Sequence, residues 1–347
     1  MHNVIISTNI HDTLTQAIAA VEHDKLFLLC DETTRQLCFP LVQDIPTLAA
    51  AIPITIGATD THKTLDTLSD VWTALSQGGG TRHSLLINLG GGMVTDLGGF
   101  AASTFKRGIA YINIPTTLLS MVDASVGGKT GINFNGLKNE VGVFSQPRTV
   151  LIDTHFLRTL DRPNILSGYA EMLKHGLIST PEHFAALLNF DLDSIDYPLL
   201  GRMVGDSVAV KERIVTEDPL EHGIRKALNL GHTAGHALES WALSRQPILH
   251  GYAVAWGLIC ELYLCCTKTN FPTEPMRQAV RFIREHYGIL PITCDDYPEL
   301  HQLMTHDKKN TADTINFTLL GGIGDIRINQ TATREEIYES LDFLREG

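Results

Sequence analysis

The stretch that decides the fold reads Leu85-Leu86-Ile87-Asn88-Leu89-Gly90-Gly91-Gly92 and continues through Asp96 to Gly98-Gly99. Its apolar start predicts a buried strand, and the glycines predict a tight turn that leads into a helix. Backbone N–H groups at such a turn can approach a phosphate closely, which suits the pyrophosphate of a dinucleotide. A glycine-rich turn used only for packing is the alternative, because the pattern is not the usual GxGxxG.

Other apolar runs of strand length alternate with helix-like segments on both sides of this stretch: Lys25 to Cys30, Pro53 to Gly57, Tyr111 to Ile114 and Thr149 to Ile152. Such alternation predicts parallel strands joined by helical crossovers. Asp31 directly follows the first run and could accept hydrogen bonds from a ribose or cap a helix. This acid precedes the glycines, which departs from the plain Rossmann fingerprint.

The second half of the chain is predicted to be mainly helical, because apolar residues recur at helical spacing over Ser167 to Ile178, Asp206 to Val215, Thr233 to Leu243, Ala253 to Cys266 and Glu274 to Tyr287. A small hairpin is expected from Thr314 to Ile328, with its turn at Gly321-Gly322. The fold class is therefore an α/β, Rossmann-like N-terminal domain, residues 1–155, followed by a mainly α-helical domain, residues 156–347.

Composition restricts the class of function. The 347 residues include 27 Lys and Arg against 39 Asp and Glu, so the formal net charge is −12. This excess of negative charge argues against nucleic acid or an anionic membrane as a partner, and an anionic substrate would need a local basic pocket. The apolar run from Tyr252 to Cys266 is too short to span a bilayer and contains Glu261, which favours a buried helix.

The cysteines and the N-terminus favour a cytoplasmic protein. No CxxC spacing occurs, so buried free thiols are expected at Cys30, Cys38, Cys260, Cys265, Cys266 and Cys294. Residues Met1 to Ile10 contain no basic segment followed by an apolar core, so we expect no secretory signal.

Candidate metal ligands cluster in the second half. His232 and His236 are four residues apart and would share one helix face, a spacing compatible with two ligands of one metal, although an isolated pair is more often structural. His250 and Glu171 lie in otherwise apolar helical stretches, where a buried polar side chain needs a partner or an ion. A carboxylate with histidines and an open position suits a catalytic zinc.

Basic residues interrupt glycine-rich or apolar segments in an otherwise acidic chain: Arg107, Lys129, Lys138, Lys174, Lys211 and Arg225. As a set they predict a pocket for phosphate or carboxylate, although each alone would be an ordinary surface charge. Gly127-Gly128-Lys129-Thr130 is similar to the end of a Walker A loop. Position 123, where that loop needs glycine, is Asp123, which excludes an ATPase.

Taken together, the motifs resemble the 3-dehydroquinate synthase family. They extend over most of the chain and comprise Gly90-Gly91-Gly92-x-x-x-Asp96, Arg107-Gly108, Pro115-Thr116-Thr117-Leu118-Leu119, Asp123-x-Ser-x-Gly127-Gly128-Lys129-Thr130, Lys138-Asn139, Gly168-x-Ala-Glu171-x-x-Lys174 and Asn229-x-Gly-His232-Thr-x-Gly-His236-Ala-x-Glu239. The resemblance implies a homodimer with NAD and a divalent metal, zinc or cobalt. It also implies conversion of 3-deoxy-D-arabino-heptulosonate 7-phosphate to 3-dehydroquinate and phosphate, through transient oxidation, phosphate elimination, re-reduction and aldol cyclisation.

The resemblance also implies roles for individual residues. Glu171, His232 and His250 would bind the metal, and His236 would lie near the reacting sugar. The NAD site would comprise Asp31, Asp60, Lys63, Gly91, Gly92, Asp96, Thr116, Thr117, Lys129, Lys138 and Thr159. Substrate would contact Arg107, Asp123, Lys138, Arg225, Asn229 and Lys308 or Lys309, with Arg107 reaching across the dimer interface. The catalytic residues would be Lys129, Asn139, His236, Lys174 and Lys211.

Three other functions are alternatives: another sugar phosphate cyclase, a metal-dependent glycerol or alcohol dehydrogenase, and an NAD-binding regulator without activity. The lysines with Asn139 argue against a dehydrogenase, and the intact set of candidate ligands argues against a regulator. Two departures from the family pattern stand out. Tyr252 replaces an acidic residue next to His250, which could alter the orientation of that ligand, and the segment from Gly57 to Thr64 is longer than usual.

Overall fold

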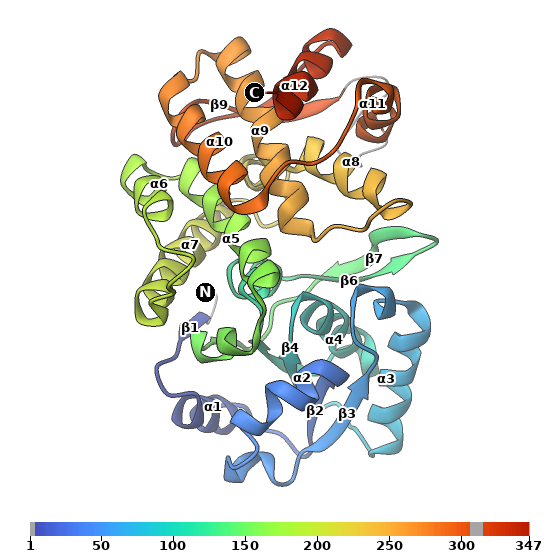
Figure 1. The fold of residues 1–347 in the computed structure, drawn as a ribbon. Helices are drawn as coiled ribbons and strands as arrows, with labels where there is room; N and C mark the ends of the chain where they lie inside the picture. The colour runs from blue at the N-terminus through green and yellow to red at the C-terminus, as the bar shows by residue number, and fades with distance from the viewer. Residues whose placement is uncertain (1–3, 306–314, 347) are drawn as a thin grey trace. The chain divides into compact units, whose positions relative to one another are not determined.

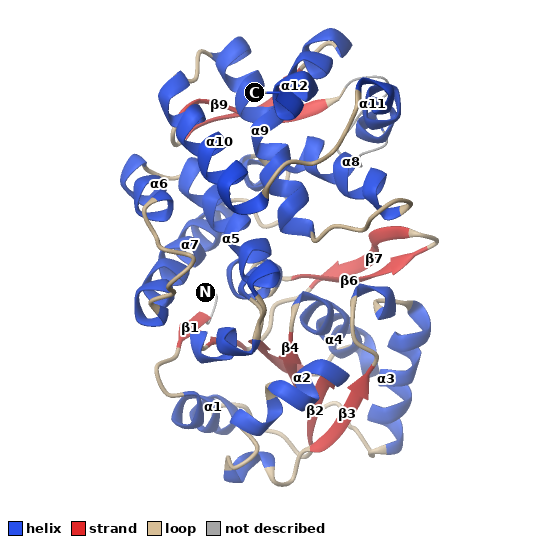
Figure 2. Ribbon diagram, in the orientation of Figure 1, coloured by secondary structure: helices blue, strands red, loops and turns tan. Residues whose placement is uncertain are grey.

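The computed structural model describes residues 4–305 and 315–346. The chain forms two compact units, one of residues 1–161 and 196–208 and the other of residues 162–195 and 209–347. Most strands lie in the first unit and most helices in the second (Figure 2). The α/β class of the first half and the helical class of the second are confirmed. The domain limits 1–155 and 156–347 stay a prediction, because compactness does not show that either segment folds alone.

A six-stranded parallel sheet forms the centre of the first unit, in the order β1-β8-β5-β4-β2-β3. Figure 1 labels β1, β2, β3 and β4 of this sheet. The strand bounds are β1 (Val4–Ile6), β2 (Leu26–Asp31), β3 (Ile52–Ile56), β4 (Leu85–Gly90), β5 (Ala110–Pro115) and β8 (Thr149–Ile152). Strands β2 and β4 are buried at every residue. This burial on both faces explains why their sequences are continuous apolar runs rather than alternating ones.

The direction in which the chain adds successive strands to the sheet reverses between β2 and β4. After β2 the chain adds β3 on one side, and then returns to place β4 on the other side of β2, followed by β5. In open parallel sheets, ligands bind beyond the carboxyl ends of the strands at such a reversal point. Asp31, the last residue of β2, and Gly91, the first residue after β4, are therefore at the position where this topology favours a ligand.

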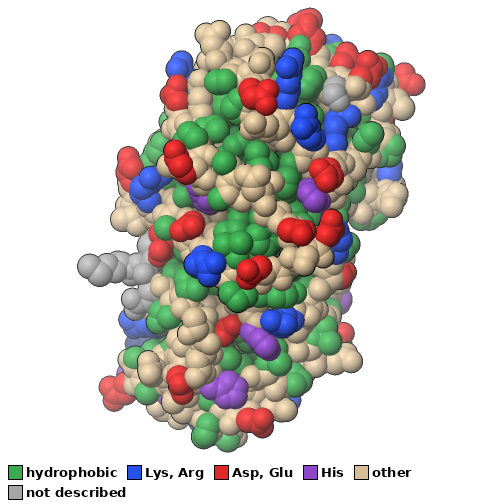
Figure 3. All heavy atoms as spheres, turned by 60° about the vertical axis from the view of Figure 1, so that its left-hand side comes forward, with side chains coloured by type: hydrophobic (Ala, Val, Ile, Leu, Met, Phe, Trp, Pro, Cys, Tyr) green, Lys and Arg blue, Asp and Glu red, His purple; other side chains and the backbone are tan. Residues whose placement is uncertain are grey.

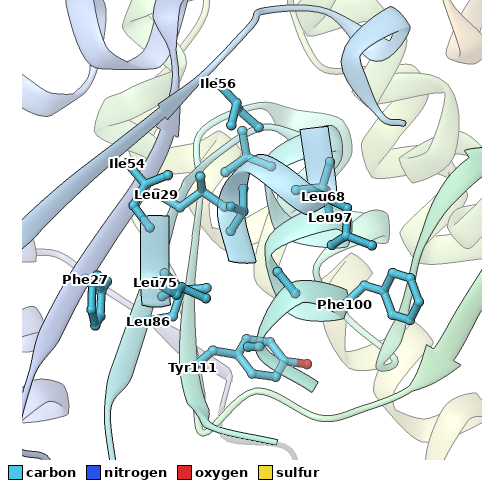
Figure 4. Packing of buried hydrophobic residues seen from close by; sticks show 14 of the residues in the cluster. Phe27, Leu29, Ile54, Ile56, Leu68, Leu75, Leu86, Leu97, Phe100 and Tyr111 are labelled. Atoms are coloured by element: carbon cyan, nitrogen blue, oxygen red, sulfur yellow. The ribbon is translucent and has the colours of Figure 1, made fainter. Parts of the chain in front are cut away.

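Helices cover the sheet of the first unit: α1 (Ile10–Ala19), α2 (Glu32–Leu37), α3 (Leu65–Gln77) and α4 (Gly92–Thr104). Leu68 and Leu75 of α3 and Leu97 of α4 pack against strand residues such as Leu29 and Leu86 (Figure 4). Full burial of one such leucine contributes about 1.5–3 kcal/mol. This packing fixes the start of α4 at the carboxyl end of β4.

A hairpin that the sequence analysis did not predict follows the sheet strands. It consists of β6 (Lys129–Phe134) and β7 (Leu137–Phe144), paired in antiparallel register. Its turn is Asn135-Gly136, with φ of 50° and 79°, and an Asn-Gly turn is a strong hairpin signal. The hairpin carries Lys129, Lys138 and Asn139, so the missed element holds three predicted site residues.

The second unit is mainly helical, with bounds α5 (Arg162–Leu177), α6 (Pro181–Leu188), α8 (His232–Leu243), α9 (His250–Thr269), α10 (Thr273–Tyr287), α11 (Tyr297–Thr305) and α12 (Arg334–Glu346). Helix α7 (Tyr197–Glu217) has residues in both units. The apolar run from Tyr252 to Cys266 lies within α9, which is buried along most of its length, as predicted. A small hairpin, β9 (Asn316–Gly322) and β10 (Asp325–Thr331), is also confirmed. Its turn was predicted two residues early, because Gly321 and Gly322 continue β9 and the left-handed residue is Gly324.

Short helical turns complete the described chain: η1 (Phe39–Leu41), η2 (Pro46–Leu48), η3 (Asp60–His62), η4 (Phe105–Arg107), η5 (Ser120–Ala124), η6 (Thr154–Thr159), η7 (Ile224–Asn229) and η8 (Cys294–Asp296). Five of them contain predicted site residues: Asp60 in η3, Arg107 in η4, Asp123 in η5, Thr159 in η6, and both Arg225 and Asn229 in η7.

On the face in Figure 3, acidic and basic side chains are interspersed. Within the described ranges, no helix is long and apolar enough to span a bilayer. All six cysteines are free thiols. Burial was predicted for all six but is wrong for two, because Cys266 is half-buried and Cys294 is exposed at the turn before α11.

Candidate active site

Three candidate metal ligands lie together in the second unit. Glu171 comes from α5, His232 is the first residue of α8 and His250 is the first residue of α9. One ligand atom from each residue lies within 4.8 Å of the others. The predicted ligands, which are 79 residues apart at their extremes (171 to 250), are therefore brought to one point by the packing of three helices.

In both imidazoles, Nδ1, the ring nitrogen that does not face Glu171, forms a hydrogen bond that orients the ring. Nδ1 of His232 is 3.1 Å from the carbonyl oxygen of Leu230, and Nδ1 of His250 is 3.2 Å from Oε2 of Glu239. Their Nε2 atoms face Oε1 of Glu171 at 3.3 Å and 3.4 Å. A metal-binding histidine commonly donates its other N–H to a carboxylate or carbonyl in this way.

The Glu171 carboxylate is suited to a cation. Glu171 is fully buried, and neither of its oxygens has a hydrogen-bond partner of ordinary geometry among the described residues. Its neighbours are the two imidazoles and the ammonium of Lys174, which forms an ion pair with Oε2 from one turn along α5. Burial opposes ionisation, but Lys174 and His232 hold the pKa of Glu171 well below its ordinary value.

The pKa values of the two imidazoles shift in opposite directions because the surroundings of the two rings differ. Burial lowers the pKa of His232 to about 4, against the attraction of Glu171. Burial also opposes the charged form of His250, but Glu239 and Glu171 outweigh it and raise the pKa of His250 to about 10. Two nitrogens and one carboxylate oxygen form a typical ligand set for a catalytic zinc or cobalt ion with an open position.

His236 lies beside this group without belonging to it. Its ring is one turn along α8, with centroids 5.3 Å from His232 and 5.9 Å from His250. The spacing of His232 and His236 thus marked the correct helix, but the group of three takes Glu171 and His250 from other helices. Sequence reasoning assigned no role to Glu239, although it lies seven residues after His232 and therefore on the same face of α8.

The other predicted residues of the second unit are mostly buried cations. Lys174, Lys211 and Arg225 are all buried, although such side chains are usually exposed. Nη1 of Arg225 donates to the carbonyl oxygen of Pro219 at 2.6 Å, and Nδ2 of Asn229 donates to Oε1 of Glu221 at 3.0 Å. Lys308 and Lys309 lie outside the described residues.

In the first unit, predicted site residues gather at the carboxyl ends of neighbouring strands. Asp31 ends β2, Gly91 and Gly92 follow β4, and Thr116 and Thr117 follow β5. The N–H of Thr116 donates to the carbonyl oxygen of Gly90 at 2.9 Å. This hydrogen bond connects the segment after β5 to the end of β4. Asp31 also caps α2, since its Oδ1 accepts the N–H of Thr34 at 2.8 Å.

The glycines leave space at the start of α4. Gly91 is the cap residue before the helix, and it has no side chain that could cap this end. A Cβ on Gly91 would lie 3.0 Å from Cγ2 of Thr117, and one on Gly92 would lie 3.2 Å from Cβ of Ala124. Side chains here would therefore fill the space above a helix N-terminus, whose N–H groups favour a phosphate.

A polar network connects two other predicted groups in the first unit. Nζ of Lys63, which is buried, lies 2.6 Å from Oδ2 of Asp96 and also donates to Oδ1 of Asn139. Asp60 accepts a hydrogen bond from Asn133 at 3.2 Å and lies 3.8 Å from Nζ of Lys138. The long Gly57 to Thr64 segment thus reaches the β6–β7 hairpin.

The remaining predicted residues of this unit are less enclosed. Arg107 and Lys129 are exposed, and Asp123 and Thr159 are half-buried. Arg107 follows Lys106 with both residues in the left-handed region, at φ of 70° and 49°. Two consecutive non-glycine residues in this region indicate backbone strain, which concentrates at functional positions.

Comparisons with known proteins agree with this arrangement. Two family models cover most of the chain: 3-dehydroquinate synthase N-terminal over residues 53–167 and 3-dehydroquinate synthase C-terminal over residues 168–310. A 3-dehydroquinate synthase of Parabacteroides distasonis is 58% identical over 345 residues, covering 99% of this chain and 98% of the relative. One from Streptococcus pyogenes serotype M3 is 33% identical, covering 99% and 96%.

Solved structures share the fold. A 2-epi-5-epi-valiolone synthase from Streptomyces hygroscopicus subsp. jinggangensis 5008, solved with NAD+ and Zn2+ bound, superposes with a TM-score of 0.85 at 26% identity, covering 99% of this chain and 96% of that one. A 2-deoxy-scyllo-inosose synthase complexed with carbaglucose-6-phosphate, NAD+ and Co2+ also gives 0.85, at 22% identity and 100% and 96% coverage. A probable glycerol dehydrogenase from Sinorhizobium meliloti 1021 gives 0.66 at 13% identity, covering 99% and 95%.

Proposed function

We propose the details of function from one premise: this chain belongs to the 3-dehydroquinate synthase family. It is an enzyme, a carbon–oxygen lyase, and its reaction is that of a 3-dehydroquinate synthase. The substrate is 3-deoxy-D-arabino-heptulosonate 7-phosphate, and the products are 3-dehydroquinate and phosphate, a step of the shikimate pathway. The Glu171, His232 and His250 cluster is the observation that carries the proposal.

We infer that Glu171, His232 and His250 hold a zinc or cobalt ion. The fit rests on two convergent Nε2 atoms and on a buried carboxylate without ordinary hydrogen bonds. Glu239 orients His250, so the second carboxylate near this ligand comes from α8. Tyr252, which replaces the usual acidic residue, instead packs against Trp256 and Tyr287. We therefore expect the substitution at 252 to leave the ligand set intact.

We assign NAD to the predicted domain of residues 1–155. Gly91 and Gly92 would admit the pyrophosphate at the start of α4, and Asp31 and the threonines after β5 would line its flanks. The remaining proposed NAD contacts are Asp60, Lys63, Asp96, Lys129 and Lys138 of this domain, together with Thr159, which lies just beyond it. When bound, NAD takes up a hydride and returns it in the same turnover, while the metal polarises substrate hydroxyl oxygens.

The protein's own residues bind the substrate anion and handle protons. Arg225, Lys211 and Lys174 are buried cations of the second unit, suited to carboxylate or phosphate. Lys129 and Asn139 are on the hairpin, and Asn229 and His236 are in the second unit, where they would orient hydroxyls. We also assign Arg107, Asp123, Lys138 and Lys308 or Lys309 to substrate.

We propose that the enzyme is a cytoplasmic homodimer. Six free thiols suit a reducing compartment. All eight residues of β7 are exposed, including Leu137, Val141, Val143 and Phe144, and exposed Arg107 lies in strained backbone. A second copy of the chain would bury such apolar residues. Light scattering after gel filtration should give about twice 38.2 kDa.

A substrate comparison tests the proposed reaction. With NAD and zinc supplied, the enzyme should release phosphate from 3-deoxy-D-arabino-heptulosonate 7-phosphate but not from glucose 6-phosphate or sedoheptulose 7-phosphate. Phosphate release from either of the other sugars instead would assign the chain to a different cyclase. Net oxidation of glycerol without phosphate release would assign it to the dehydrogenases.

A further inference from the structure

A buried carboxylate outside the ligand set contacts the same helices. Glu261 is on α9, in the middle of an apolar helix, and its exposed fraction is 0%. In the sequence it is the charge that interrupts the run from Tyr252 to Cys266. A buried charge is costly unless hydrogen bonds satisfy it, so this glutamate calls for a structural explanation.

Glu261 accepts hydrogen bonds from the first turn of α8. Its Oε2 lies 2.6 Å from the backbone N of Gly231, and its Oε1 lies 2.9 Å and 3.1 Å from the backbone N atoms of Thr233 and Ala234. These N–H groups belong to the residue before α8 and to its second and third residues. The carboxylate therefore caps a helix from outside its own sequence, at the end where negative charge is favoured.

The chain cannot supply this cap locally. Helices usually begin with Ser, Thr, Asp or Asn, whose side chain accepts the free N–H groups. Here the cap position is Gly231, with φ of 80°, and a Cβ would lie 2.8 Å from Cδ2 of Leu258 and 3.2 Å from the carbonyl oxygen of Val254. The left-handed backbone and close contact with α9 exclude an ordinary capping residue, so the acceptor must come from α9.

We propose that Glu261 is a positioning residue for the metal ligand His232. His232 lies between the N–H groups that Glu261 holds, and its Nδ1 contacts Leu230 in the same segment. The direction of its Nε2 therefore depends on backbone that Glu261 fixes. Helix α9 also carries His250. The Glu261 carboxylate therefore connects the backbone around His232 to the helix that carries His250. This inference rests on the proposed metal site.

The test is metal affinity in a near-isosteric variant. E261Q keeps the size of the side chain but places an amide donor against an N–H donor. Zinc affinity should fall about 10- to 100-fold, the usual effect of losing support behind a ligand. The absorption bands of the cobalt-loaded protein should change as well, because they depend on ligand geometry.

The matched control is E336Q. Glu336 accepts the backbone N–H of Thr333 at 2.7 Å before α12 and forms an ion pair with Lys268 of α9. E336Q thus removes a carboxylate cap that touches the same helix α9 but no ligand segment, and its zinc affinity should match that of the wild type. Equal loss of thermal stability in both variants, with the zinc affinity of E261Q within twofold of wild type, would overturn the proposal.

Amide hydrogen exchange gives a readout that needs neither metal nor turnover. In the metal-free wild type, the segment from Asn229 to His236 should be protected, and E261Q should lose that protection. If E261Q does not fold, E261D is measured in the same way. This variant keeps the negative charge, but its side chain is one methylene shorter, so the carboxylate lies further from the N–H groups of α8. Fast exchange of this segment in the wild type would contradict the proposal. Phosphate release tests the proposed function separately, so failure of one can be distinguished from failure of the other.

Discussion

At the scale of single residues, side chains of the proposed site have different roles, and the effects of losing each one should be separable. His232 contributes an Nε2 directed at Glu171. We expect His232→Ala to abolish turnover and to lose bound zinc, because the site would keep only two of its three ligands. Metal content by elemental analysis checks the loss. His301→Ala, which changes a half-buried histidine of α11, should keep both metal and activity. A fully active His232→Ala protein with normal zinc would refute the ligand assignment.

Replacing Lys129 should also lower turnover, but without loss of zinc. It is an exposed residue at the start of β6, so Lys129→Ala should leave zinc content and melting temperature unchanged. Turnover should fall by at least 100-fold, since a cation assigned to substrate and cofactor is lost. Parallel assays of metal content and phosphate release check this, with Lys25→Ala as an exposed lysine control. Zinc loss in Lys129→Ala would show that the lysine acts on the fold instead.

Sequence reasoning could name candidate ligands where the residue type itself suits a metal. His232 and His236 were identified as candidate ligands by their spacing, and His250 and Glu171 because they lie in otherwise apolar helical stretches. The choice between His236 and His250 needed either the family resemblance or the structure, since helical spacing is local whereas the group joins three helices. Glu261 was noted as an interruption, but its contacts with Gly231 and Thr233 come from packing that no local pattern records.

At the scale of elements, the crossing of α8 and α9 depends on glycine. A Cβ on Gly257 would meet the carbonyl oxygen of Gly231 and lie 2.6 Å from the backbone N of Gly235. Gly257→Ala should therefore destabilise the protein by about 1–3 kcal/mol or more and weaken zinc binding. Gly322→Ala, where a Cβ meets nothing within 4 Å, should cost less than about 0.5 kcal/mol. Thermal melts of both variants test this, and equal melting temperatures would contradict the close crossing.

The contact between α9 and α12 predicts a pH dependence. The Lys268 ammonium and the Thr333 N–H lower the pKa of Glu336 below its ordinary 4.5. A lowered pKa means that this stabilisation is present above about pH 4.5 and is lost as the pH falls through the lower folded value. E336Q should therefore be less stable than wild type by about 1 kcal/mol at pH 7. The gap should narrow as the pH falls below about 4.5, and urea titrations showing a constant gap would contradict this.

Elements were predictable where burial imposes a pattern. Strands β2 and β4 are buried throughout, and their apolar runs identified them. The β6–β7 hairpin was missed because β7 is exposed at every residue, so its sequence has no alternation to detect. Its Asn135-Gly136 turn was the available signal. The hairpin turn at Gly324 was misplaced because two adjacent glycines, Gly321 and Gly322, attracted the prediction.

At the scale of the whole molecule, the Rossmann-like unit and the helical unit carry residues suited to different parts of a redox-neutral lyase reaction. Each unit supplies one part of the chemistry: the sheet edge after β2 and β4 suits NAD, and the helical cluster suits a metal. The sequence predicted both units, since periodicity separates sheet from helix. It could not predict the irregular division, in which residues 196–208 belong to the first unit, because that depends on contacts between distant segments.

The most direct test follows phosphate release and absorbance near 340 nm together, with 3-deoxy-D-arabino-heptulosonate 7-phosphate, NAD and zinc. NAD is expected to return its hydride in every turnover. Phosphate should therefore accumulate with no net NADH, and a chelator should stop its release until zinc or cobalt is restored. Steady accumulation of NADH, or phosphate release that survives removal of both metal and NAD, would contradict the account.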